Sequence, residues 1–215
     1  MWCVSELDDE FVERMEDVLD LYERPLNVDQ PVVCVDERPI QLHGEKRQGR
    51  LVCRGKPARY DYEYIRKGTA NIFCAVEPRA GKHITKVTPT RSGPEFAKML
   101  MAIARRYPAV STIHLVMDNL STHFVSSVIK HYGNERGSDL WNRFTIHYTP
   151  KHGSWLNQAE IEIGVLNKQC IGKRRIGDLA TLQGEVRQWN RMANKQRVKI
   201  DWKFTKAKAR KLFKY

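Results

Sequence analysis

Apolar and polar positions alternate along the chain with two periods, and these periods predict helices and strands. Between residues 8 and 25, apolar side chains recur at helical spacing on one face, while acidic side chains occupy the other. Further helical patterns cover residues 92–108, 121–133 and 179–195, and another begins at Ser154, whose side chain is the expected N-cap. Strands are predicted for three shorter runs, at residues 31–37, 112–118 and 144–150.

The segment between residues 44 and 78 has the pattern of antiparallel strands. Residues 44–57 are basic and interrupted by glycines, which indicates a turn or hairpin with residues 50–53 as a candidate strand. Aromatic and polar side chains then alternate over residues 58–68, and a turn at Lys67 and Gly68 leads into an apolar strand at 69–78. Since helices and strands alternate further on, we predict an α/β protein with helices on the faces of a mixed sheet, and a polar excursion at 134–143.

The composition excludes several classes of protein. The 215 residues, 41% of them hydrophobic, suffice for one substantial α/β domain with tails. No apolar run reaches 18 residues, so no membrane span is expected, and the first residues lack the pattern of a signal peptide. The five cysteines are scattered without a Cys-x-x-Cys motif, which argues against a zinc site or a disulfide framework. These features together predict a cytoplasmic protein.

The net charge of +12 is distributed unevenly. Residues 1–30 contain ten acidic and two basic residues, a balance of −8, so the remaining 185 residues carry +20. Residues 163–215 alone contain fifteen Lys or Arg against three acids, and they end in a basic amphipathic tail. Such a tract favours a polyanionic partner, most often nucleic acid, although a basic surface that only keeps a protein soluble has the same composition.

Two of the predicted strands end on a carboxylate. Asp36 follows PVVCV and Asp118 follows IHLVM, and ligand-binding or catalytic groups gather at the carboxyl ends of central strands. Two carboxylates that meet there repel each other unless a cation joins them, and Mg²⁺ prefers such oxygen ligands. The helix that begins at Ser154 offers Glu160 or Glu162 as a third acid. Because the two lie about 200° apart around a helix, only one can face the site, and periodicity does not choose between them.

Three stretches that contain these acids resemble the motifs of DDE transposases of the mariner-like superfamily. They are VDE (35–37), MDNLSTH (117–123) and YTPKHGSWLNQAEIEIG (148–164), and they are most similar to the insertion-sequence 630 family. The resemblance selects Asp36, Asp118 and Glu160 as the acidic triad, because Glu160 follows Asn157 by three residues. It covers about residues 28–200, the expected catalytic domain, which leaves an acidic N-terminal helix and linker at 1–27 and a basic C-terminal tail at 201–215. The helix-turn-helix region that family members usually carry before the catalytic domain is not expected in this chain.

The resemblance implies an RNase H-like fold with a mixed five-stranded sheet and flanking helices. Asp36 would lie on the first strand, Asp118 on the fourth, and Glu160 on a helix beside them. The three acids would hold two Mg²⁺ or Mn²⁺ ions and catalyse cleavage and strand transfer of double-stranded DNA, at transposon ends and a target, without a covalent enzyme intermediate. A homodimer and association with the nucleoid are further expectations. Two alternatives remain open: a plain RNase H-like nuclease, and a truncated, non-catalytic DNA-binding remnant.

Further residues near the three acids are candidates for supporting roles. Asn119 contacts phosphate, orients Asp118, or is a turn residue, and His123 lies at the site or is structural. Asn157 supports Glu160 or caps its helix. The basic side chains expected to contact DNA are Arg47, Arg50, Arg54, Lys56, His152, Lys173, Arg174 and Arg175.

Overall fold

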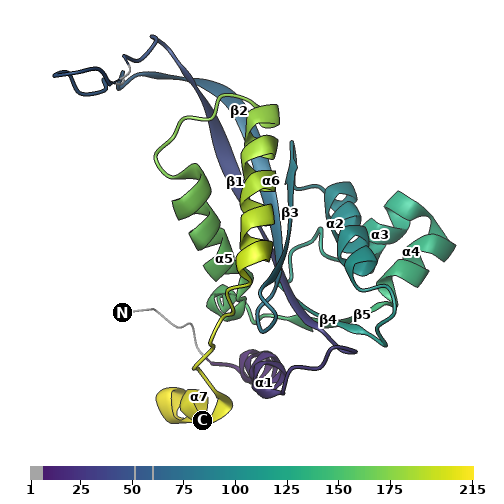
Figure 1. Cartoon of the computed structure of the whole chain (residues 1–215). Helices are drawn as coiled ribbons and strands as arrows, with labels where there is room; N and C mark the ends of the chain where they lie inside the picture. Colours follow the sequence, from purple (N-terminus) through teal and green to yellow (C-terminus); the bar gives the residue numbers. More distant parts are fainter. Residues whose placement is uncertain (1–6, 51, 60) are drawn as a thin grey trace.

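A five-stranded mixed sheet forms the centre of the computed structural model, which describes residues 7–50, 52–59 and 61–215 (Figure 1). The strand order is β3-β2-β1-β4-β5, with β1 at Val32–Glu45, β2 at Tyr64–Glu77, β3 at Lys82–Thr88, β4 at Ile113–Met117 and β5 at Phe144–Tyr148. The pairs β1–β2 and β2–β3 are antiparallel, whereas β1–β4 and β4–β5 are parallel. The predicted α/β class and the mixed five-stranded sheet are therefore confirmed.

Helices cover both faces of this sheet (Figure 1). Val33 and Val35 point to one face, where they share a hydrophobic cluster with α2 (Gly93–Arg106), α3 (Val125–Tyr132) and α4 (Asn134–Trp141). Cys34 lies between them and points to the other face, because side chains alternate along a strand. That face carries α1 (Asp9–Glu23), α5 (Ala159–Leu166) and α6 (Leu179–Gln196). In the described residues, no helix is both long and apolar enough to cross a membrane.

The acidic N-terminal helix and the basic C-terminal helix α7 (Lys206–Phe213) pack against each other. Arg210 of α7 donates two hydrogen bonds to Glu16 of α1, at 2.7 and 2.8 Å, and Lys206 pairs with Asp20 at 2.5 Å. Buried side chains of both helices share the cluster that contains Cys34 of the sheet. The charge asymmetry of the sequence is thus partly internal, because the acidic segment faces the basic tail. The division of the chain near residues 27 and 200 remains a prediction.

A β-bulge replaces the turn that was predicted at Lys67 and Gly68. The antiparallel register pairs Gln41 with Thr69 and then His43 with Arg66, so that two residues of β2 lie opposite Leu42 alone. Gly68 has φ of 106°, a conformation that glycine adopts at little cost. The turn prediction was wrong because the glycine serves a bulge inside one continuous strand from Tyr64 to Glu77.

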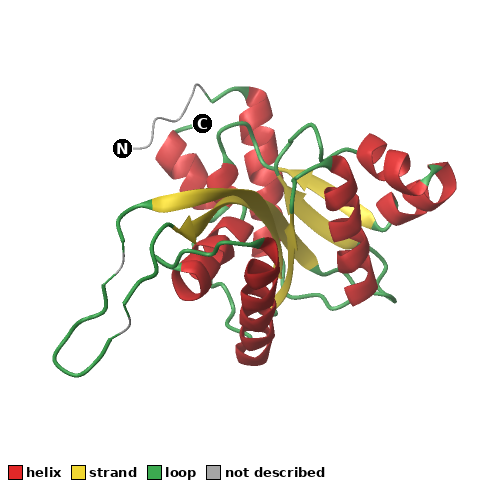
Figure 2. Ribbon diagram, turned by 90° about the horizontal axis from the view of Figure 1, so that it is seen from above, coloured by secondary structure: helices red, strands yellow, loops and turns green. Residues whose placement is uncertain are grey.

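Residues 46–63, here called the arm, connect β1 and β2 and extend away from the sheet and helices (Figures 1 and 2). The candidate strand at 50–53 contains only isolated bridges, Arg50 to Arg59 and Cys53 to Lys56. The strand predicted over 58–68 begins only at Tyr64. Tyr62 lies outside this strand and is 86% exposed. The parts of these predictions that fall on Leu51 and Tyr60 lie outside the described residues.

Several other elements differ from the predicted ones. Strand β3 was not predicted, and α4 occupies the stretch that was expected to be a polar excursion. The helix α4 is polar but packs closely on α3. A Cβ added at Gly137 of α4 would lie only 2.7 Å from the Cα of Ile129 in α3. This tertiary contact holds α4 in place. The helix expected from Ser154 is instead a short 3₁₀ turn at Ser154–Leu156, then α5, then a π-helical turn at Asn167–Ile171. Ser154 makes no side-chain cap.

Candidate active site

Asp36 and Asp118 lie on neighbouring parallel strands of the sheet. Asp118 directly follows β4, as predicted, but Asp36 does not end β1, which continues to Glu45. The register pairs Cys34 with Val116, so two residues further on Asp36 is level with Asp118. Asp36 therefore lies beside the point where the shorter strand β4 ends. The prediction of a strand end at Asp36 was wrong because local sequence does not show how long the neighbouring strand is.

The two candidate glutamates on α5 have different surroundings. Glu162 is buried, and its carboxylate lies 2.8 Å from Nε2 of His83 on β3. Glu160 is exposed in the first turn of α5. The side chain of Asn157 joins this turn to β1, because its amide donates to the carbonyl of Val35 at 2.8 Å and its oxygen accepts from the N–H of Ala159 at 3.1 Å. Asn157 thus combines a capping contact with a direct link to the strand of Asp36.

The pKa of Asp36 lies well above the usual value of an aspartate. Burial is the main cause that raises the pKa of Asp36 to about 7, and the negative charges of Glu37, Asp118 and Glu160 raise it further. The N–H of Glu37 donates to Asp36 at 2.8 Å, which opposes this shift without cancelling it. A divalent cation would favour the ionised form of a buried carboxyl group whose pKa is raised in this way.

His123 lies between two carboxylates directly behind Asp118. It is 2% exposed, its Nδ1 lies 2.6 Å from Oδ1 of Asp118, and its Nε2 lies 3.4 Å from Oε2 of Glu37. Burial alone would lower the pKa of His123, but the hydrogen bonds and charges of Asp118 and Glu37 raise it to about 9. Burial acts to raise the pKa of Asp118, yet His123 brings it below its usual value. The imidazolium therefore holds one oxygen of an ionised Asp118.

Glu37 is a residue of the site that the sequence reasoning did not identify. Its side chain is 4% exposed and faces the helix layer opposite to that faced by Asp36, since the two are adjacent on β1. The available signal was a second acid next to the first, inside a run that is otherwise apolar. Its partner His123 is 86 residues away in the chain, so spacing could not pair them.

The donor set around Asp36 fits a hard divalent cation in chemistry, although its side chains are not yet arranged as ligands. Among the described residues, no three His, Cys, Asp or Glu side chains stand close enough to hold a metal ion as they are. One oxygen of Asp118 is held by His123, while its side chain remains 42% exposed. Asp36, Asp118 and Glu160 thus supply carboxylate oxygens, the kind of donor that Mg²⁺ and Mn²⁺ prefer.

A cleft of about 730 Å³ opens beside Asp118. Asn119, Lys151 and His152 line it on one side, and the first turns of α1 line it on the other. His152 is exposed and has φ of 63°, in the left-handed region. The cleft therefore brings the predicted residues Asn119 and His152 next to Asp118, whereas Asp36 and Glu160 do not line it.

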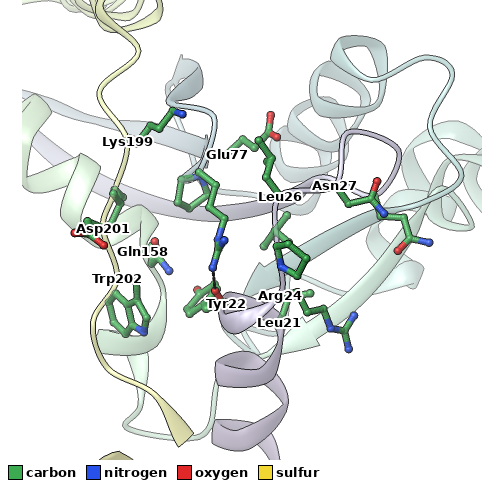
Figure 3. A pocket seen from close by; sticks show the side chains of 16 residues that line it. Leu21, Tyr22, Arg24, Leu26, Asn27, Glu77, Gln158, Lys199, Asp201 and Trp202 are labelled. Carbon is green, nitrogen blue, oxygen red and sulfur yellow. Dashed lines mark hydrogen bonds between the residues drawn. The ribbon is translucent and has the colours of Figure 1, made fainter.

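A second pocket, of about 420 Å³, lies at the C-terminal end of α1 (Figure 3), and none of the three acids lines it. Tyr22, Glu77, Arg79, Gln158 and Trp202 are among its lining residues, and the guanidinium of Arg79 donates to the carbonyl of Tyr22 across it (Figure 3). None of the predicted site residues lines this pocket, so it gives no support to the carboxylate site.

The basic residues that were expected to contact DNA fall into two groups. Arg174 binds the Glu185 carboxylate at 2.9 Å, and Arg175 donates to the carbonyls of Glu63 and Asp61, so both contact the protein itself. Arg47 lies 3.4 Å from Glu63 although it is 71% exposed. Exposed side chains without an ion pair in the described part of the chain are Arg50, Arg54, Lys56 and Lys173, three of them on the arm. Contact with DNA stays a prediction for every member of the set.

The fold and the acidic site together define an RNase H-like chain in which Asp36 and Asp118 lie level with each other on the central parallel strands. Residues 31–183 match the family described as DDE superfamily endonuclease, and the chain belongs to this family. The family predicted from the three motifs is thus confirmed, while the narrower insertion-sequence 630 assignment remains a prediction. No curated protein matches this chain significantly.

Solved structures with a similar fold include complexes of the Mos1 mariner transposase. The paired-end complex with Mn is 15% identical, with a TM-score of 0.55, and the match covers 92% of this chain and 61% of that one. The paired-end complex with Mg is 17% identical, with a TM-score of 0.56, and covers 90% and 59%. The Mos1 strand transfer complex is 14% identical, with a TM-score of 0.57, and covers 92% and 60%. At this identity the likeness establishes the fold, and the chain spans about three fifths of those chains.

Proposed function

We propose that this chain is the catalytic domain of a transposase that cleaves DNA and joins the freed strand to a target. The observation that carries the proposal is that Asp36 and Asp118 lie level on neighbouring parallel strands, while Asn157 joins the first turn of α5, which contains Glu160, to β1. Membership of the DDE endonuclease family supports it. The Mos1 structures of the same fold, which are complexes with transposon ends or a strand transfer product, support the choice of DNA.

In this proposal Asp36, Asp118 and Glu160 hold two Mg²⁺ or Mn²⁺ ions. Such ions supply charge that activates the attacking oxygen and stabilises the leaving oxygen of a phosphodiester. The protein itself positions the acids that hold these ions. His123 fixes one oxygen of Asp118, and Asn157 fixes the start of α5 against β1. Burial of Asp36 strengthens the charge interactions of this one carboxylate, because its local dielectric constant is lower than that of water.

The substrate in this proposal is double-stranded DNA, held chiefly through its phosphates. The arm presents Arg54 and Lys56 at its tip, and Lys173 is exposed between α5 and α6. Contacts of this kind position DNA without specifying its sequence. Recognition of transposon ends, capture of a target, action as a homodimer, and a cytoplasmic place at the nucleoid are parts of the same proposal.

The proposal is tested by nicking of a duplex that carries candidate element ends, with Mg²⁺ or Mn²⁺. We expect Asp118→Ala to reduce cleavage at least ~1000-fold, since losing a metal ligand removes several kcal/mol of transition-state stabilisation. Asp139→Asn on α4 is the matched control, because Asp139 is exposed and forms no ion pair in the described residues. Equal cleavage by wild type and Asp118→Ala would remove the catalytic assignment. Cleavage without strand transfer would indicate a plain nuclease, and salt-sensitive binding without cleavage a DNA-binding remnant.

A further inference from the structure

A groove of about 670 Å³ lies at the free edge of β3, between α2 and α6. Figure 1 shows β3 between these two helices, at the end of the sheet away from β4 and β5. His83 and Thr85 of β3 form its floor, with residues of α2 and α6 as its walls. None of Asp36, Asp118 or Glu160 lines this β3-edge groove, so it is separate from the carboxylate site.

Four cationic side chains line the groove without counter-ions. Arg105 and Arg106 come from the last turn of α2, and Arg191 and Lys195 are one turn apart on α6. All four are exposed, and none has a carboxylate oxygen within 4.0 Å in the part of the chain that the structure describes. The acid beneath the groove, Glu162, is already paired with His83. The groove therefore carries four uncompensated positive charges.

The edge of β3 is covered at two positions and left open between them. The side chain of Asn194 pairs with both the N–H and the carbonyl of His83, at 3.0 and 2.8 Å, and Gln183 donates to the carbonyl of Val87 at 3.3 Å. Because backbone groups alternate in direction along a strand, those of Thr85 point outward as well. Among the residues that the structure describes, no side chain of α6 forms a hydrogen bond with the backbone of Thr85, which lines the groove with an outward N–H.

Two buried polar atoms beside the groove also have no partner. Nδ1 of His83 and Oδ1 of Asn190 are inaccessible to solvent and form no hydrogen bond among the described residues. Both residues line the groove. An amide oxygen only accepts hydrogen bonds, so Oδ1 of Asn190 cannot pair with a phosphate oxygen. The four exposed cations alone favour an anion in the groove.

We propose that the β3-edge groove binds the phosphate backbone of duplex DNA. Two pairs of cations on two helices, with a backbone N–H between them, match a row of phosphates better than a single enclosed anion. The contacts would be independent of sequence, because cations and backbone N–H groups recognise phosphate oxygens rather than base edges. This inference rests on the proposed function only in that the substrate is DNA. It adds a second DNA-binding surface at the β3 edge of the sheet, opposite to the edge formed by β5.

The test compares two double variants that each remove two positive charges. Arg191→Ala with Lys195→Ala changes the groove, and Lys130→Ala with Lys211→Ala changes exposed, unpaired lysines on α3 and α7. Binding to a labelled duplex of unrelated sequence is measured by fluorescence anisotropy over a series of salt concentrations. We expect the groove variant to lower the slope of log K against log salt by about 2 and the affinity at least ~10-fold, because each phosphate contact contributes about 0.9 to the slope. The control should keep the wild-type slope.

Equal weakening by both double variants, or by neither, would overturn the proposal. Thermal unfolding of each variant must match wild type, so that lost binding reports the groove and not the fold. A further series replaces chloride with inorganic phosphate at equal ionic strength. We expect no specific effect of phosphate, and selective displacement of DNA from wild type alone would make the groove a small-anion site instead.

Cleavage measured on the same proteins separates this proposal from the proposed function. Asp118→Ala should lose cleavage and keep the wild-type salt slope, since Asp118 does not line the groove. If wild type cleaves no duplex but the groove variant still loses binding, the transposase assignment fails and the groove stands. If wild type cleaves and the groove variant binds as wild type does, the groove proposal fails alone.

Discussion

Glu160 and Glu162 stand two residues apart on one short helix and have opposite situations. Glu162 is buried, and its carboxylate lies 2.8 Å from Nε2 of His83. Glu160 is exposed, and it contributes, after burial, Glu37 and Asp118, to the raised pKa of Asp36. We infer from this difference that Glu160 is a better candidate than Glu162 for a metal ligand. The pair Glu162–His83 joins α5 to β3. Asp36 instead lies near the carboxylates of Glu37, Asp118 and Glu160, which add to the effect of burial in raising its pKa.

The largest effect should come from removing an acid of the trio. Asp36→Asn keeps the size of the side chain and removes the negative ligand, so we expect cleavage to fall at least ~1000-fold. The same assay on Asp139→Asn gives the effect of losing an exposed acid, which should be none. Cleavage by Asp36→Asn within tenfold of wild type would mean that Asp36 belongs with Glu162, as a structural acid.

The stability of the metal-free protein should depend on pH through Asp36. A carboxyl whose pKa is raised in the folded state destabilises that state once its unfolded counterpart ionises, so stability should fall as pH rises from about 4 to 7. The upper limit for this loss is about 4 kcal/mol, from a shift of about three pKa units. Denaturant unfolding of wild type and Asp36→Asn at several pH values measures it. Parallel stability curves for the two proteins would contradict the shift, and Mn²⁺ should restore stability to wild type alone.

A smaller effect is expected from the residues behind Asp118. His123→Gln removes the cation that holds Asp118, and we expect a 10- to 100-fold loss in apparent Mn²⁺ affinity, as for other residues that orient metal ligands. Glu37→Gln should act in the same direction and more weakly, because Glu37 lies 3.4 Å from His123 and reaches Asp118 only through it. Titration of cleavage against Mn²⁺ checks this order. Unchanged Mn²⁺ dependence in both variants would make the Glu37–His123 pair structural.

The smallest effect on cleavage is expected for Glu162, the acid that is paired with His83. Glu162→Gln should leave cleavage unchanged and reduce the free energy of unfolding by about 1–3 kcal/mol, since it removes one charge of a buried, hydrogen-bonded pair. Urea unfolding at pH 7 gives the value. Loss of cleavage with an unchanged unfolding midpoint would reverse the roles of the two glutamates.

The sequence predicted some strands and acids of the site better than the tertiary contacts that these acids and strands make. Strand β4 and the position of Asp118 followed from one apolar run that stops at an acid, which is local information. The extension of β1 beyond Asp36 depends on pairing with β2, and no periodicity within residues 31–45 shows it. Likewise α4 is polar and is held by the close contact of Gly137 with Ile129. Local patterns predict elements, whereas tertiary packing decides their ends.

The side chains that pair with the acids could not be predicted from local sequence, because they come from distant parts of the chain. His83 is 79 residues from Glu162, and its strand β3 was itself not predicted. Spacing therefore left Glu160 and Glu162 equal, and only the resemblance to a known motif preferred Glu160. The structure supports that preference through burial and pairing, which are properties of the folded chain.

Binding of Mn²⁺ to Glu160→Gln and Glu162→Gln tests the central claim most directly. Each variant loses one negative charge from the same helix and keeps its side-chain volume, so each is the control for the other. Electron paramagnetic resonance of free Mn²⁺ measures binding without reference to cleavage. We predict that Glu160→Gln loses at least ~10-fold in Mn²⁺ affinity and that Glu162→Gln binds as wild type does. Wild-type binding by Glu160→Gln, with loss in Glu162→Gln, would contradict the assignment of the site.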